Sequence, residues 1–222
     1  MKKIKFISAF IVFALLLSLG SAFAIDEAVV KEAVADLNEL KIMVGDENGD
    51  FRGDANITRA EFATIICRVL GQEGQAKYLQ DSPGYFTDTA GHWANGYINV
   101  ANQQKIINGF EDSTFRPDEN VTVAQAIKML VCTLGYEDDS VRTTGYPLGY
   151  INKGNYINLY TNVTSYGEAL EQSNDFATRN YIAALVHNAL DINLRVQTSW
   201  SMDGNHSFDV TEETIRTKYL SE

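Results

Sequence analysis

The chain has 222 residues, of which 45% are hydrophobic and 21% charged, a balance typical of folded domains and not of disordered chains. Its 29 acidic side chains outnumber its 18 basic ones, which gives a formal net charge of -11. This excess disfavours nucleic acid and anionic membranes as partners, so an anionic ligand would need arginine or lysine side chains placed locally around it.

The first 24 residues have the features of a secretory signal peptide. Lys2, Lys3 and Lys5 precede an apolar run over residues 6–19, and Ala22 and Ala24 are the small residues that a signal peptidase needs for cleavage after Ala24. The apolar run is shorter than the roughly 20 residues that cross a bilayer, which argues against a membrane anchor. We expect cleavage to leave a soluble exported chain with no membrane span. It would retain 15 basic side chains against 29 acidic ones, a formal charge of -14.

Residues 25–71 predict a helix, a loop and a second helix. Apolar residues at helical spacing predict a first helix that ends before Gly45. A polar loop then leads to Thr58, an N-cap with Glu61 at the capping-box position, and the apolar stripe of the second helix ends at Gly71.

The same unit occurs twice more along the chain. Residues 41–71 recur without a gap as residues 105–135, at a constant offset of 64. Identical pairs at this offset include Lys41/Lys105, Gly45/Gly109, Phe51/Phe115, Arg52/Arg116, Thr58/Thr122 and Gly71/Gly135. Thr178 caps a third helix with a similar apolar stripe. A fixed period marks units that bury their apolar faces against one another, so we interpret residues 25–71, 85–135 and 146–191 as three repeats.

The segments outside the repeats predict little regular structure. Residues 72–84 and 136–149 are rich in Gly, Pro, Gln, Asp and Thr, and we expect loops there. In the tail, residues 192–222, Asp203-Gly204 predicts a hairpin between residues 196–200 and 208–210, and residues 211–220 predict a closing helix. Cys67 and Cys132 lie at non-equivalent positions in apolar helical stretches, so we expect buried thiols and no disulfide.

Ordered motifs follow one another through the second repeat. They are Phe86-Thr87-Asp88, Gly91-His92-Trp93-Ala94, Ile106-Ile107-Asn108-Gly109, Thr114-Phe115-Arg116-Pro117-Asp118 and Val121-Thr122. With them this repeat resembles an S-layer homology (SLH) unit almost from end to end. The first repeat carries Thr58-Arg59-Ala60-Glu61, the hallmark tetrapeptide of that family, and the third resembles it loosely through Tyr150-Ile151 and Thr178-Arg179. The resemblance spans about residues 26–191.

The resemblance implies an all-α fold of three helix-loop-helix SLH repeats in a pseudo-threefold arrangement around a central three-helix bundle, with grooves between adjacent units. It also implies a non-catalytic role at the bacterial cell wall. Such modules attach exported proteins to a secondary cell-wall polysaccharide bound to peptidoglycan, often one with pyruvate ketals. A pyruvylated sugar offers a carboxylate to a guanidinium and a sugar face to an aromatic ring. We expect no cofactor and no metal.

Carried over to this chain, the resemblance places its arginine at Arg59 and Arg179, and we expect both to bind the ligand's carboxylate. The alternative is an exposed arginine at a helix start, where the helix dipole disfavours a cation. Val123 holds this place in the second repeat, which predicts an impaired groove. Because the first and third repeats also depart from the pattern, we expect one intact groove that combines Arg59 with residues around Trp93.

The other candidate ligand residues each have a structural alternative. Trp93 is a sugar platform or a core aromatic between two units. Asp88 is an acceptor for sugar hydroxyls or an N-terminal cap. Arg52 and Arg116 each follow a repeated phenylalanine, so they are ligand contacts or parts of a structural plug with a salt bridge. Gly109 ends a helix and also lets a ligand approach the backbone.

Other functions stay open at this stage. The loop over residues 45–50 places Asp46, Asn48 and Asp50 like alternate calcium ligands, but Ile57 stands where the twelfth-position ligand is needed. We find no metal-ligand spacing of histidines, nucleophile elbow or phosphate loop that would indicate an enzyme. Two alternatives to a self-contained anchoring module remain. The chain is the N-terminal anchor of a larger surface enzyme or S-layer protein, or it is a self-assembling or protein-binding surface module that has lost glycan binding.

Overall fold

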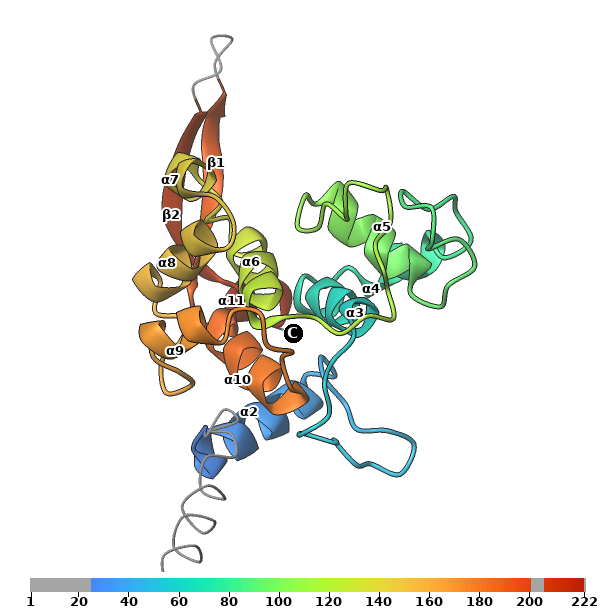
Figure 1. The fold of residues 1–222 in the computed structure, drawn as a ribbon, viewed down its shortest axis with the longest axis horizontal. Coiled ribbons are helices and arrows are strands. Elements are labelled where there is room, and N and C mark those ends of the chain that lie inside the picture. Colours follow the sequence, from blue (N-terminus) through green and yellow to red (C-terminus); the bar gives the residue numbers. More distant parts are fainter. Residues whose placement is uncertain (1–24, 201–205, 222) are drawn as a thin grey trace, which may run out of the picture.

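A computed structural model describes residues 25–200 and 206–221 (Figure 1). In this part of the chain the fold is largely helical, with one two-stranded sheet. The elements are α2 (Glu27–Glu39), α3 (Arg59–Val69), α4 (Glu73–Tyr78), α5 (Asn95–Gln103), α6 (Val123–Thr133), α7 (Asp139–Thr144), α8 (Leu148–Tyr156), α9 (Tyr166–Glu171), α10 (Arg179–Leu190), β1 (Asn193–Trp200), β2 (His206–Thr214) and α11 (Ile215–Tyr219). The signal peptide and the Asp203-Gly204 turn lie outside the described residues. None of the described helices is both long enough and apolar enough to cross a membrane.

Three capped helices, α3, α6 and α10, form the middle of the molecule (Figure 1). In α3 the Thr58 hydroxyl accepts from the Glu61 amide at 3.2 Å, and the Glu61 carboxylate accepts from the Thr58 amide at 3.0 Å. Thr122 and Gln125 make the same capping box in α6. Thr178 caps α10 alone, since tyrosine replaces the glutamate there. These are the helix starts that the sequence predicts.

The segments before these helices bond to one another in a closed ring. The Ile57 amide donates to the Ala177 carbonyl at 3.2 Å, the Ala177 amide to Val121 at 3.0 Å, and the Val121 amide back to Ile57 at 3.0 Å. A second ring follows two residues later, in which the amides of Arg59, Val123 and Arg179 donate to the carbonyls of Glu119, Asp175 and Ala55. The segments before α3, α6 and α10, which are far apart in the sequence, are thus bonded to one another in space.

The first helix of each unit, α2, α5 or α8, is an outer helix and packs on the central helix of a neighbouring unit. Helix α2 packs against α10, α5 against α3 and α8 against α6. The two helices of one repeat therefore belong to different packed pairs, and each groove between an outer and a central helix joins two repeats. In α2 the apolar stripe buries Ala33 and Leu37 completely.

The links between repeats are helical where the sequence predicted loops. Helix α4 lies in residues 72–84 and packs against α5, where Gly96 permits the contact because an added Cβ would lie 1.9 Å from the Ala76 carbonyl. Helix α7 lies in residues 136–149, and the Asp138 carboxylate caps it by accepting from the Val141 amide at 3.2 Å. The loop prediction was wrong for these segments, because packing on α5 stabilises α4, and the Asp138 cap with packing on α8 stabilises α7, despite weak helix propensity.

The tail is an antiparallel hairpin followed by a short helix. Strand β2 extends to Thr214, so α11 begins later than the predicted residue 211. The Tyr136 hydroxyl donates to the Asn193 carbonyl at 2.9 Å, which fixes the start of β1 against the end of α6. The Arg216 guanidinium lies 2.8 Å from Asp36 of α2 and 2.8 Å from Asp191 after α10. The C-terminal helix is thereby joined to the first helix.

Cys67 and Cys132 are both free thiols, as predicted. Burial raises the pKa of each to about 12, so both stay protonated and unreactive at neutral pH.

Candidate functional site: two related grooves

Two grooves of about 210 Å³ each lie between an outer-helix C-terminus and a central helix. Groove A is lined by Arg59, Ile106, Ile107, Asn108, Gly109, Phe110, Gln125, Lys128, Met129 and Tyr146. Groove B is lined by Ile42, Met43, Val44, Gly45, Asp46, Arg52, Glu61, Thr64, Ile65, Arg68, Trp93 and Arg179. Eight positions from Ile42 to Ile65 in groove B match positions of groove A at the offset of 64. The internal repeat thus builds the same hollow twice.

Each groove contains one buried arginine from the first turn of a central helix. In groove A, Arg59 is 8% exposed. Its Nε donates to the Phe115 carbonyl at 2.8 Å and its Nη1 to Gln125 Oε1 at 3.1 Å. Its Cζ lies 4.5 Å from the centre of the Phe115 ring and 4.8 Å from that of Phe110. The guanidinium thus lies within cation–π distance of two aromatic rings.

Arg179 occupies the matching place in groove B and is 9% exposed. Its Nε donates to the Phe51 carbonyl at 2.8 Å and its Nη2 to the Val44 carbonyl at 3.0 Å, while its Cζ lies 4.8 Å from the Phe51 ring centre. Phe51 and Phe115 are repeat equivalents, so both grooves orient their arginine in the same way.

Neither arginine forms an ion pair with a carboxylate of the residues that the structure describes. Burial lowers the pKa of Arg59 to about 10, with Glu119 acting against this from longer range, and burial also lowers the pKa of Arg179. Both guanidinium groups are still charged at neutral pH. Two of the five N–H groups of each are used, so each groove presents a desolvated cation with donors to spare.

An exposed aromatic side chain stands at the edge of each groove. Trp93 is 54% exposed and lines groove B with Arg179, whereas Tyr146 is 53% exposed and lines groove A with Arg59. The predicted combination of Arg59 with Trp93 in one groove is therefore wrong. The reason is the packing of outer helices on neighbouring units, which sends the residues before α5 toward groove B and those before α8 toward groove A.

The two grooves differ in charge. Groove A carries Lys128 and Phe110 where groove B carries Thr64 and Asp46. In groove B the Asp46 carboxylate lies 3.8 Å from Arg52. Groove A holds two cations and no carboxylate, while groove B holds three arginines with Asp46 and Glu61.

The second repeat lacks an arginine at the equivalent position. Val123 stands in the arginine place and is fully buried. Tyr181, the equivalent of Glu61 and Gln125, is also fully buried and is among the largest enclosed side chains. These two buried side chains carry no charge, in contrast to Arg59 with Gln125 in groove A and Arg179 with Glu61 in groove B.

Asp88 lines neither groove. Its carboxylate accepts from the Phe115 amide at 2.8 Å and from the Arg116 amide at 2.7 Å. Both residues follow the sharp loop of the second repeat, where Arg116 has a φ of 57°. The geometry gives Asp88 the role of holding this loop, and with it Phe115, whose carbonyl accepts from Arg59 of groove A. The contact of Asp88 with sugar hydroxyls stays a prediction.

Of the remaining predicted ligand residues, two line a groove, namely Arg52 and Gly109, and Arg116 lines neither groove. The Arg116 Cζ lies 4.0 Å from the Phe110 ring centre on the outer side, and its Nη2 pairs with Asp112 at 3.0 Å. Arg52 lines groove B. Gly109 lines groove A at a φ of 67°, and an added Cβ would lie 2.3 Å from the Phe86 ring, so this position requires glycine.

The groove A residues that sequence reasoning missed include the aromatic and polar side chains Phe110, Gln125, Lys128 and Tyr146. Gln125 and Lys128 follow Thr122 by three and six residues, which is one face of α6 and was a readable signal. Tyr146 lies in a segment predicted as a loop, and nothing local indicated its place in a groove.

The acidic loop before Phe51 does not gather calcium ligands. Asp46 Oδ1 accepts from the Asn48 amide at 2.9 Å and the Asp50 amide at 3.1 Å, and Asp50 accepts from the Arg52 amide at 2.9 Å. The carboxylates of Asp46 and Asp50 therefore accept hydrogen bonds from backbone amides of their own turn. Among the described residues no group of three His, Cys, Asp or Glu side chains is placed to hold a metal ion.

Comparison with known proteins gives the same family for two of the repeats. Residues 26–63 and 85–127 match the S-layer homology (SLH) domain. The chain is 37% identical over 194 residues to the middle cell wall protein of Brevibacillus brevis, which covers 87% of this chain and 17% of that protein. It is also 37% identical over 194 residues to the surface layer protein of Brevibacillus choshinensis, covering 87% of this chain and 16% of the relative. A cellulosome-anchoring protein of Acetivibrio thermocellus is 33% identical over 98 residues, 44% of this chain and 22% of that protein. The chain thus spans less than a quarter of the length of each of these relatives.

Proposed function

We propose that this chain is a non-catalytic anchoring module that binds an anionic secondary cell-wall polysaccharide, attached to peptidoglycan, through grooves A and B. The observation that carries this proposal is the pair of buried arginines, neither of which has an ion-pair partner among the carboxylates that the structure describes. A buried, unpaired charge costs several kcal/mol, and a carboxylate that enters the groove offsets this cost. The protein is secreted and resides at the bacterial cell surface, in keeping with the SLH match and with relatives named for the cell wall and the surface layer.

The ligand's carboxylate meets Arg59 in groove A and Arg179 in groove B, as a pyruvate ketal would. The sugar ring lies against Tyr146 or Trp93 at the edge of the groove, where an exposed aromatic face is available. In groove A the Lys128 ammonium adds a second cation. The remaining hydrogen bonds come from side-chain amides such as Gln125 and from the backbone at Gly109.

We also propose that the residues around α8 and α10 form a third, divergent SLH repeat, and that a pseudo-threefold axis relates the three. The two closed rings of backbone hydrogen bonds and the cyclic packing of α2 on α10, α5 on α3 and α8 on α6 support this arrangement. The buried Val123 and Tyr181 account for a third position without a ligand.

The module works in one of two settings. Because each of the relatives is much longer than this chain, one setting is a larger surface protein that the module attaches to the wall. The cellulosome-anchoring relative carries that role in its name. The other setting is a surface protein of this length acting by itself.

Co-sedimentation with cell-wall sacculi tests the proposal. Protein starting at Ile25 is mixed with sacculi before and after chemical removal of the secondary polymer, and the bound fraction is measured. We expect binding to disappear with the polymer, and we expect Arg59→Met and Arg179→Met each to weaken it by about tenfold or more, because charge-assisted hydrogen bonds are lost. Lys77→Met removes an exposed cation of α4 and serves as the control. Equal binding to stripped sacculi would show that the polymer is not the ligand, and retention by neither preparation would favour self-association or a protein partner.

A further inference from the structure

A third and larger hollow, of about 610 Å³, lies between α8, the C-terminal end of α10 and the tail hairpin. Its lining shares no residue with groove A or groove B. We call it the hairpin cleft, and it is lined by Tyr136, Tyr156, Ile157, Asn158, Thr161, His187, Asn188, Asp191, Ile192, Asn193 and Val210. Its volume falls in the range of about 300–1,000 Å³ that small-molecule sites occupy.

The walls of the hairpin cleft are fixed by hydrogen bonds. The Asn188 amide donates to the Leu159 carbonyl at 3.0 Å and the Thr161 carbonyl at 2.8 Å, which ties α10 to the loop after α8. The backbone amide of Arg195 donates to Leu134 at 2.9 Å, and its side chain lies 3.3 Å from Asp138. With the Tyr136 bond to Asn193, these contacts hold the hairpin as a rigid wall, so the cleft is preformed.

The acidic and imidazole side chains that line the cleft each contact a partner side chain. His187 Nε2 lies 3.3 Å from Asp36 of α2. Asp191 lies 2.8 Å from Arg216 of α11, which also pairs with Asp36. Unlike grooves A and B, the hairpin cleft presents no unpaired cation among the described residues, so it offers nothing for a carboxylate or phosphate.

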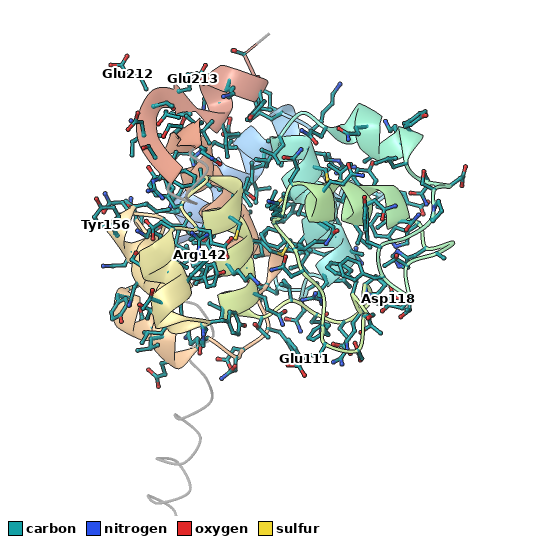
Figure 2. All side chains as sticks on the ribbon, turned by 90° about the horizontal axis from the view of Figure 1, so that it is seen from above. Glu111, Asp118, Arg142, Tyr156, Glu212 and Glu213 are labelled. Carbon is teal, nitrogen blue, oxygen red and sulfur yellow. The ribbon has the colours of Figure 1, made fainter. Side chains whose placement is uncertain are left out.

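The other groups of the cleft are neutral, and the nearby Lys153 ammonium, 5.1 Å from the centre of the Tyr156 ring, is paired with Asp138 at 2.8 Å. Tyr156 is 75% exposed at the end of α8 and projects at the edge of the molecule (Figure 2). The side-chain amides of Asn158 and Asn193 make no hydrogen bond to the described residues, and both are exposed. Each amide has two donors and an acceptor, the combination that pairs with hydroxyl groups, which both donate and accept.

We propose that the hairpin cleft is a separate binding site for a neutral saccharide. The sugar face packs on the Tyr156 ring, and its hydroxyl groups bond to the amides of Asn158 and Asn193. Apolar patches from Ile192 and Val210 cover the carbon side of the ring. A peptide is a poorer fit, because most of the lining comes from the C-terminal ends of α8 and α10 and the segments that follow them, and the hairpin strands contribute only Asn193 and Val210.

An array of neutral oligosaccharides tests this site. Hexose and N-acetylhexosamine oligomers of two to four units, without carboxylate or phosphate groups, are immobilised beside neutral peptides. The full chain from Ile25 is applied, and the dissociation constant for the best-retained sugar is measured by calorimetry. We expect Tyr156→Ala to weaken binding by about tenfold, which corresponds to about 1.4 kcal/mol. Asn158→Gly removes only the amide, because glycine tolerates the φ of 59° at this position, and it should weaken binding severalfold.

Two controls distinguish sugar binding in the hairpin cleft from binding in the grooves and from non-specific binding. Tyr78→Ala removes an 84% exposed tyrosine that lines none of the three hollows and should leave the affinity unchanged. The double variant Arg59→Met/Arg179→Met should lose binding to sacculi but keep the neutral sugar. The proposal is overturned if no neutral sugar is retained, if only peptides are, if Tyr156→Ala binds like the unaltered chain, or if the arginine variants abolish sugar binding.

Discussion

Arg59→Met should separate the stability of the fold from its binding function. Burial lowers the pKa of Arg59 from 12.5 to about 10, so its surroundings disfavour the charged guanidinium by about 3 kcal/mol relative to water. Methionine removes this cost and fills a similar volume. It also removes the hydrogen bonds to Phe115 and Gln125, a loss of about 2 kcal/mol. We expect the free energy of unfolding to change by no more than about 1 kcal/mol.

Urea unfolding followed by circular dichroism measures this free energy, and co-sedimentation with sacculi measures binding on the same preparations. The account predicts a variant that is as stable as the original chain but binds at least about tenfold more weakly. Lys77→Met, which removes a positive charge from the exposed face of α4, should change neither quantity. A loss of more than about 3 kcal/mol in stability with unchanged binding would refute the reasoning, because Arg59 would then be a structural residue.

Three further predictions concern other parts of the fold. Arg216→Ala should lower the free energy of unfolding in urea by about 1–2 kcal/mol, because it cuts the bidentate link between α11 and the carboxylates of α2 and α10. Partial burial raises the pKa of Asp138, but hydrogen bonds from Lys153 and Ser140 outweigh it and lower the pKa from 3.8 to about 2. The ionised Asp138 carboxylate therefore contributes to the stability of the folded state fully above pH 3.8, and this contribution is lost toward pH 2. Because Asp138 pairs with Arg195 of β1, the NMR signals of β1 should broaden in that window, and Asp138→Asn should remove the effect. Val123→Arg should destabilise the fold by about 3 kcal/mol or more in urea, without adding a third groove, because it places an unpaired charge at a fully buried position.

Features set by local sequence could be predicted well. Thr58, Thr122 and Thr178 cap their helices because a threonine hydroxyl bonds the free amides of a helix start whatever surrounds it. The offset of 64 also predicted correctly that equivalent residues take equivalent places. Helix α9, which the sequence analysis omitted, has a readable capping box between Ser165 and Glu168.

Features set by contacts between repeats could not be predicted. The sequence places Trp93 in the same repeat as the groove A loop, yet it lies in groove B, since α5 packs on the central helix of another repeat. Asp88 was expected to be an acceptor for sugar hydroxyls or an N-terminal cap, whereas its carboxylate bonds backbone amides 27 and 28 residues away. The hairpin cleft depends on where the tail docks, which the tail's own sequence does not encode.

The most direct measurement of the central claim follows the arginine side chains themselves. The protein is labelled with nitrogen-15, and the Nε–Hε signals of its arginines are assigned by substitution. Soluble fragments of the secondary polymer are then added stepwise. The account predicts that the signals of Arg59 and Arg179 shift in a saturable way while that of Arg216, paired with two carboxylates away from the grooves, stays in place. Saturable binding of the polymer with neither Arg59 nor Arg179 affected would contradict it.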